Sequence, residues 1–309
     1  MSKKYIISVL AALSCAGLAQ GQTLLYEYNF NDYTNGTYTL STGSESATAN
    51  FTNYVEEGSP AREAYNLFGS SGSGVSGLAG DYAFNNTAST QMGGNSNSAG
   101  YGGAAMASSN VTAFSGLSSY TISGWYNASV LPSNYARLIE IGGSSDVTSL
   151  LFQGSAGSTS TNLRLRTKVG GTTYTLDAAD DSENPILLLS NAWVFFAVTV
   201  DGVNGTMTIY AGTDETSVVQ MSTVSIGTGT VTVGGSSMAI GNSLSNNQER
   251  PFDGLMDNVR IWGSDTDASG ALDISTLESI RASDTVPEPS AYAALIGAMV
   301  LALALLRRR

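Results

Sequence analysis

The sequence contains no histidine and only one cysteine, Cys15. Without histidine there is no Ser-His-Asp triad, no Cys-His pair and no histidine-ligated zinc, so any catalysis must use carboxylates, Tyr, Lys or Arg. Cys15 falls inside an N-terminal apolar segment, and therefore no disulfide framework holds the folded part together. Stability must come from a large core, which a chain of 309 residues is long enough to bury.

Basic residues are also scarce. Lys and Arg total 13 against 25 Asp and Glu, which gives a formal net charge of −12. Five of the basic residues lie at the two ends of the chain, so the middle is more acidic still. A surface of this sign repels nucleic acid and anionic lipid, and it suits divalent cations or neutral glycans. We therefore expect no nucleic-acid partner.

No long stretch between the two ends has helical periodicity, and the content of 35 glycines and 15 tyrosines indicates an all-β chain. The clearest element lies at residues 191–212. Residues 193–200 form an apolar run of β-branched and aromatic residues, residues 201–205 have turn chemistry, and residues 206–210 alternate again. Glycine and asparagine supply the positive φ that a tight connection needs. The pattern predicts a β-hairpin.

A second hairpin is predicted at residues 163–176. Its first strand, LRLRTK, alternates leucine or threonine with basic residues, and a Gly-Gly turn returns the chain. Many short strands separated by turns, in a chain long enough for two sheets, favour one antiparallel two-sheet sandwich of jelly-roll type. The other strands are expected at 24–30, 120–130, 137–142, 218–226, 231–233, 238–241 and 254–262. A short helix at 272–282, with Ser275 and Glu278 as a Ser-x-x-Glu capping box, is expected to end the domain.

Residues 1–21 have the three parts of a secretory signal peptide. Lys3 and Lys4 precede an apolar core, and small residues surround Ala19. We expect this segment to be a signal helix that directs export, with cleavage after Ala19 or, as the alternative, after Gly21. The folded domain is then predicted to span residues 22–285.

The C-terminal segment, residues 286–309, has a pattern of its own: a proline-rich motif, an uncharged run at 291–306 and three arginines. Sixteen helical residues span about 24 Å, just short of a hydrocarbon core, and the arginines favour the cytoplasmic side. A short transmembrane helix is therefore expected at 291–306. The motif consists of Pro287, Glu288 and Pro289, and the arginines are Arg307, Arg308 and Arg309.

This arrangement resembles the PEP-CTERM sorting signals of bacteria that have an outer membrane. The resemblance implies transient insertion in the inner membrane, processing by an exosortase-type enzyme near the proline motif, and delivery to the cell surface, the outer membrane or the extracellular matrix. The alternative is a plain tail anchor that is never removed.

The order of four motifs resembles the laminin-G-like, concanavalin A-like lectin/glucanase jelly rolls. The motifs are YTISGWYNAS at 120–129, the hairpin at 191–212, MAIGNS at 238–243 and PFDGLMDNVRIWGSD at 251–265. The resemblance covers about half of the chain and weakens between residues 30 and 110. It implies two sheets in which the first and last strands are neighbours, so residues 24–30 should pair near residues 254–262.

Asp257 is the carboxylate that this resemblance singles out. GLMDNVRIW is similar to the final strand of the glucanase branch, where an Asp at the matching place helps to hold a structural calcium ion. Calcium takes hard oxygen ligands, including backbone carbonyls, so one or two carboxylates are enough. Asp257 is the first expected ligand, and Asp32 at the far end of the first strand is the second. The alternative is that Asp257 only binds neighbouring backbone amides.

No catalytic pair is evident. The glucanases of this superfamily carry Glu-x-Asp-x-x-Glu on one strand, and Glu140 lacks both partners here. We therefore expect no enzymatic activity. The acidic loop at 177–183 is read as solvated. The tryptophans at 125, 193 and 262 fall within motifs of the core, whereas Tyr82, Tyr101 and Tyr135, on predicted loops, are better placed to contact a glycan.

The sequence thus predicts an exported surface or matrix protein whose non-catalytic, lectin-like jelly roll binds polysaccharide or matrix. Two alternatives remain open: a purely structural or adhesive matrix protein with no small-ligand site, and a degenerate glycanase or polysaccharide lyase.

Overall fold

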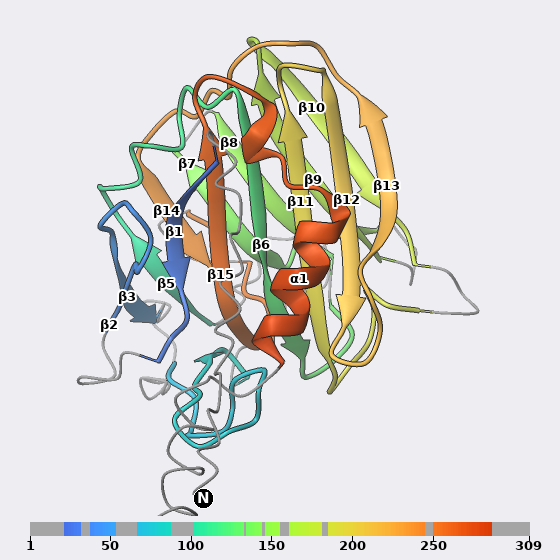
Figure 1. Ribbon diagram of the computed structural model, residues 1–309. Helices are drawn as coiled ribbons and strands as arrows, with labels where there is room; N and C mark the ends of the chain where they lie inside the picture. The colour runs from blue at the N-terminus through green and yellow to red at the C-terminus, as the bar shows by residue number, and fades with distance from the viewer. Residues whose placement is uncertain are drawn as a thin grey trace, which may run out of the picture.

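The computed structural model describes residues 22–31, 38–53, 67–87, 102–132, 134–143, 146–154, 161–180, 185–244 and 250–285. Two antiparallel β-sheets pack face to face in it, as the sequence predicted (Figure 1). The expected signal peptide at 1–21 and the expected membrane segment at 291–306 lie outside these ranges. Within the ranges, every helix is too short or too polar to cross a membrane.

We call the sheet that contains both the first and the last strand sheet A. Its seven strands follow the order β1-β15-β6-β11-β12-β13, and the short β4 pairs with β15. The pairing of β1 with β15 confirms the predicted adjacency of the first and last strands. The strands are β1 (Thr23–Tyr28), β4 (Phe84–Asn85), β6 (Ser119–Ala128), β11 (Trp193–Asp201), β12 (Thr206–Thr213), β13 (Val219–Ser225) and β15 (Gly254–Ser264).

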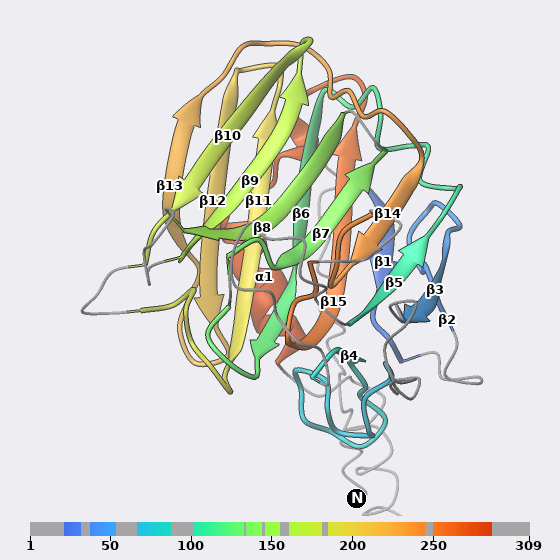
Figure 2. The same cartoon turned by 180° about the vertical axis from the view of Figure 1, so that it is seen from behind.

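The other sheet, sheet B, has eight strands in the order β10-β9-β8-β7-β14-β5-β3-β2. Figure 2 shows it from its outer side. The strands are β2 (Tyr38–Leu40), β3 (Thr48–Asn53), β5 (Gly103–Ala107), β7 (Arg137–Gly142), β8 (Val147–Gly154), β9 (Thr161–Val169), β10 (Thr172–Ala178) and β14 (Ser237–Ile240).

The predicted central hairpin is confirmed as β11 and β12, which pair without a break in register. Its turn is held by Asp201, whose Oδ1 accepts the backbone N–H groups of Val203 and Asn204 at 2.9 and 2.8 Å. Gly205 takes the positive φ of 71° that returns the chain. Because these interactions are local, the sequence pattern was enough to predict them.

Several strands were not predicted. The segment of β5, GAAMA, has no β-branched residue, and β8 follows a loop with little patterning, so neither stood out as a strand. Conversely, residues 231–233 do not form a strand, and Val231 makes a single bridge to Val169. Long-range pairing partners, which propensity does not report, decide these cases.

The main core lies between the two sheets. The fully buried ring of Tyr126 on β6 contacts the ring of Phe152 on β8 at 5.5 Å and that of Phe252 at 5.6 Å, both edge to face. Its hydroxyl donates a hydrogen bond to the carbonyl of Leu187 at 2.6 Å, so the buried polar atom is satisfied. One large aromatic residue thus connects both sheets and a loop.

The helix α1 (Ile274–Asp284) lies across the outer face of sheet A (Figure 1). Leu277 is fully buried in a second apolar cluster together with Trp125 and Phe195. The predicted capping box is wrong, because the N-cap is Asp273, which accepts the N–H of Thr276 at 2.7 Å. Ser275 therefore lies inside the helix, one residue beyond its start. Asp at an N-cap accepts a backbone N–H with a full negative charge, which favours it over the later serine.

Candidate functional site

The outer face of sheet B is polar and carries the candidate site. On β9, Leu163 and Leu165 are fully buried against sheet A, and the alternation of a strand therefore directs Arg164 and Arg166 to the outside. Figure 2 shows no helix across this side, whereas α1 covers the opposite side of the molecule. Among the described residues, this face of sheet B is exposed at Arg166 and Thr175 on β9 and β10, whereas Glu140 and Ser149 on β7 and β8 are buried.

Two ion pairs order this face. The guanidinium of Arg164 makes two hydrogen bonds to the carboxylate of Asp177 on β10, at 2.6 and 2.7 Å. Lys168 pairs with Asp146 at 2.9 Å. Arg166 lies between these pairs on β9, is exposed, and has no ion pair among the described residues. The bidentate pair fixes the Arg164 head group, while Arg166 keeps its donors available to a ligand.

Glu140 on β7 belongs to the same face and is 5% exposed. Its Oε1 accepts hydrogen bonds from Arg137 Nε at 2.8 Å and Ser149 Oγ at 3.2 Å. Its Oε2 accepts the N–H of Leu244 at 2.6 Å, which fastens a loop to the sheet. The strand register places Glu140, Ser149 and Arg166 in one row across β7, β8 and β9.

An aromatic ring lies beside this row, close to the start of β7. The guanidinium of Arg250 lies 4.4 Å from the centre of the Tyr135 ring, a cation–π contact. Tyr135 has a left-handed φ of 72°, and its N–H donates to the carbonyl of Phe152 at 2.6 Å. The carbonyl of Tyr135 accepts a hydrogen bond from the Arg137 guanidinium at 3.4 Å, which places the residue next to the first side chain of β7. Tyr135, predicted to contact a glycan, therefore borders the candidate site.

Asp257 lies far from solvent, on β15, with an exposure of 0%. Its carboxylate accepts the N–H groups of Val75 at 2.9 Å and of Asn258 at 2.7 Å. Burial raises its pKa well above the usual range, the charge of Asp81 raises it further, and the two N–H bonds lower it. These amide contacts are the ones that the alternative interpretation predicted.

The other expected ligand and the sorting residues lie outside the described residues. These residues are Asp32, Pro287, Glu288, Pro289, Arg307, Arg308 and Arg309. Tyr101, which was expected to contact a glycan, also lies outside the described residues. Within the described part of the chain, no three His, Cys, Asp or Glu side chains are grouped to hold a metal ion. A calcium ion at Asp257 would therefore need hydroxyl or carbonyl oxygens as further ligands.

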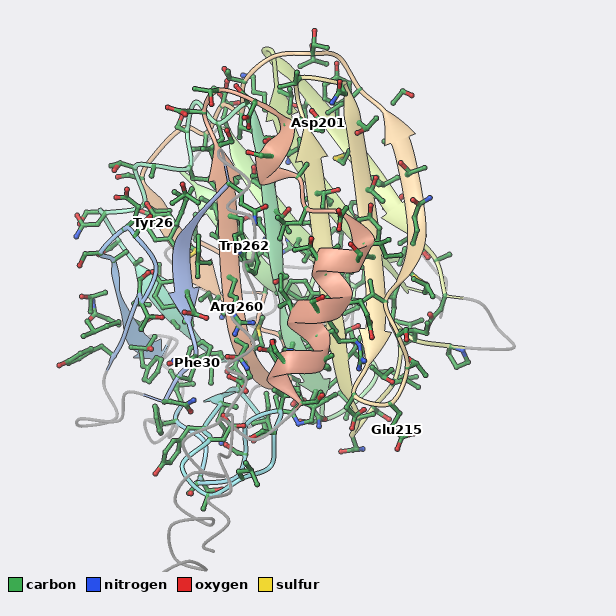
Figure 3. The ribbon with its side chains drawn as sticks, in the orientation of Figure 1. Tyr26, Phe30, Asp201, Glu215, Arg260 and Trp262 are labelled. Carbon is green, nitrogen blue, oxygen red and sulfur yellow. The ribbon has the colours of Figure 1, made fainter. Side chains whose placement is uncertain are left out.

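The tryptophans are structural, as expected. Trp125 and Trp262 belong to the apolar cluster beneath α1, and Trp193 packs against that cluster. Figure 3 shows Trp262 and Arg260 on β15, on the side of the molecule that α1 covers. Tyr82 packs on Phe68 with ring centres 5.2 Å apart, so its ring is also used within the protein.

The two described carboxylates of the acidic segment at 177–183 are partly exposed, and both also make hydrogen bonds within the protein. Asp177 pairs with Arg164, and Asp180 accepts the N–H groups of Ile186, Leu187 and Leu188 at 2.8 to 2.9 Å. Both side chains find partners that the sequence pattern does not show, because those partners come from a neighbouring strand or a later turn.

Two antiparallel sheets with neighbouring first and last strands and an open outer face define a lectin-like jelly roll. The sequence model of a family described as the concanavalin A-like lectin/glucanases superfamily matches residues 97–269. The chain belongs to this family. A search of curated proteins gave no match.

Two solved structures illustrate the shared fold. Domain 4 of AbnA, an extracellular GH43 arabinanase from Geobacillus stearothermophilus solved in complex with arabinotriose, is 17% identical with a TM-score of 0.50 over 85% of this chain and 100% of that one. The receptor-binding domain of botulinum neurotoxin mosaic serotype C/D is 9% identical, also with a TM-score of 0.50, over 84% of this chain and 50% of that one. At these identities the similarity concerns the fold alone.

Proposed function

We propose that this protein binds carbohydrate on the outer face of sheet B and does not cleave it. The carrying observation is that the polar side chains of Arg166 on β9 and Thr175 on β10 are exposed on a face that no described helix covers, with the ring of Tyr135 at one end. Glycans are recognised by such sets of hydrogen-bonding groups next to an aromatic face. The arabinanase domain of the same fold, which was solved with arabinotriose, supports this class of ligand.

The state of the carboxylates supports binding without hydrolysis. A glycosidase needs two carboxyl groups that face the sugar and exchange a proton with it. Here Glu140 is held by Arg137, Ser149 and the N–H of Leu244, and Asp177 is held by Arg164. Carboxylates fixed in this way are positioned to order the face rather than to act as acid and base.

A glycan array with the purified protein tests this function. We expect binding to at least one polysaccharide and a clear loss of binding in Tyr135→Asn, in which asparagine tolerates the left-handed backbone of Tyr135. Val203→Asn, at the exposed tip of the β11–β12 turn, is the matched control. Binding that Tyr135→Asn leaves unchanged contradicts this location, and no binding to any glycan favours the structural matrix alternative.

The place of action is a separate part of the proposal. A signal peptide at 1–21 and a sorting segment at 286–309 together direct the domain to the cell surface, the outer membrane or the matrix. The exosortase-type step predicts that the mature protein ends near Pro287. Mass measurement of the protein recovered from the cell surface distinguishes this from an uncleaved anchor, which retains Arg309.

A structural calcium ion is a further part of the proposal. The charge of Asp81 raises the pKa of Asp257, so the two carboxylates repel one another, and the buried hydroxyl of Ser73 in the loop of Asp81 has no hydrogen-bond partner among the described residues. These are hard oxygen donors, so the residues fit a calcium ion. When bound, such an ion would offset the repulsion between Asp81 and Asp257 and so hold the loop of Ser73 against β15.

A further inference from the structure

The few basic residues of this acidic protein are concentrated on one face. The chain carries 13 Lys and Arg against 25 Asp and Glu. The face just described nevertheless holds Arg164, Arg166 and Lys168 on a single strand. Side chains two residues apart on a strand are about 7 Å from one another, so β9 presents three cations in a line. Arg137 and Arg250 add two more at the end near Tyr135.

The acidic groups on this face neutralise two of the three cations in that line, Arg164 and Lys168. Each of the three described carboxylates is already paired, Glu140 with Arg137, Asp146 with Lys168 and Asp177 with Arg164. The balance leaves the exposed guanidinium of Arg166 without an ion pair among the described residues. Arg166 lies between Ser149 on β8 and Thr175 on β10, whose side chains share its face of the sheet.

We infer that the face formed by β7 to β10 selects anionic polysaccharide, a glycan that carries carboxylate or sulfate groups, with Arg166 as its principal anion contact. This inference rests on the proposed carbohydrate binding and names the substrate class of the same face. It replaces the expectation of a neutral glycan, which was drawn from net charge and took no account of where the charges lie.

The arrangement favours a glycan over other polyanions. The exposed Thr175 offers a hydroxyl next to Arg166, and the partly exposed ring of Tyr135 lies at one end of the face. The net charge of −12 opposes any polyanion over the rest of the surface, so the preference for a glycan rests on the groups beside Arg166.

The test measures binding of the purified protein to immobilised polygalacturonate, dextran sulfate, neutral arabinan and single-stranded DNA. We expect binding to polygalacturonate or dextran sulfate that weakens between about 10 mM and about 1 M salt, because the screening length falls from about 30 Å to about 3 Å. We expect Arg166→Gln to weaken this binding about fivefold at low salt and Arg166→Lys to retain most of it. Because Arg166 is exposed, both variants should unfold at the parent temperature.

Gln220→Glu on β13 is the matched control, since it is exposed, lies in the other sheet and changes the net charge by the same amount. We expect it to leave binding within about twofold of the parent. Equal effects of the two variants, or no effect of Arg166→Gln, overturn the inference, as does DNA binding as tight as that of either anionic glycan. Binding to arabinan alone overturns the inference and leaves carbohydrate binding standing, whereas binding to no glycan overturns both.

Discussion

Arg260 on β15 and Asp284 at the end of α1 form a two-point ion pair, with nitrogen–oxygen distances of 2.7 and 2.9 Å. The Asp284 carboxylate also accepts the indole N–H of Trp125 at 2.9 Å. Burial lowers the pKa of Arg260, but the carboxylates of Asp284 and Glu27 outweigh it and raise that pKa above the usual value. These contacts hold the helix on sheet A and so keep that face closed.

Removing one member of this pair should be costly. Asp284→Asn leaves the Arg260 guanidinium without its full countercharge in a site where the Asp284 side chain is 4% exposed. We expect a loss of about 3 kcal/mol in the free energy of unfolding, measured by urea denaturation. Asp177→Asn, which breaks a more exposed pair, should cost no more than about 1 kcal/mol. Equal losses in the two variants would show that burial of the pair has no special effect.

The start of α1 gives a second test. Asp273→Ala removes the side chain that accepts the Thr276 N–H, and we expect it to cost about 1 kcal/mol of unfolding free energy. Ser275→Ala, at the position that the sequence favoured as a cap, should stay within about 0.5 kcal/mol of the parent. Thermal unfolding of the two variants side by side measures the difference, and the reverse order of stability would restore the predicted capping box.

Glu278 predicts a dependence of stability on pH. The Arg281 guanidinium lowers the pKa of Glu278 from 4.5 to about 2, burial opposes that shift, and the Val218 N–H adds to it. Because the folded pKa is below the unfolded one, the stabilisation is complete above about pH 4.5 and is lost as the pH falls toward 2.

Glu278→Gln isolates this effect, since glutamine keeps an acceptor for Val218 but has no charge. We expect the parent to exceed this variant in urea midpoint at neutral pH, and the difference to shrink steadily below about pH 4.5. A difference that stays constant down to about pH 2 would mean that Glu278 has an ordinary pKa in the folded protein.

Calcium should raise the thermal midpoint of the parent. A site that binds only the folded state adds about 2.7 kcal/mol at a hundredfold excess of ion over its dissociation constant. Asp257→Asn should remove most of this increase, and a chelator should make the parent resemble the variant. Asp201→Asn, at the tip of the β11–β12 hairpin, should respond to calcium as the parent does. Identical midpoints in calcium and chelator would leave Asp257 with the amide role alone.

Local patterns explain the part of the fold that the sequence predicted. The β11–β12 hairpin depends on Asp201 and Gly205 and on the strands directly beside them, and all of these lie within one short stretch. The alternation of Leu163 and Leu165 with basic residues likewise predicted which side of β9 is buried. The alternation identified those basic residues of β9, but no pattern in the sequence indicated that Tyr135 and Arg250 lie at the same face of sheet B.

The sequence by itself therefore determined the fold class, the hairpins and the family, because strand alternation and turn chemistry act between near neighbours. Only the tertiary structure decided which side chains meet. The carboxylate of Asp257 accepts a hydrogen bond from the N–H of Val75, which is 182 residues away in the sequence. The guanidinium of Arg260 on β15 pairs with Asp284 at the end of α1. The row from Glu140 to Arg166 exists because the register of three strands aligns them. Such partners depend on long-range packing, for which periodicity and spacing carry no signal.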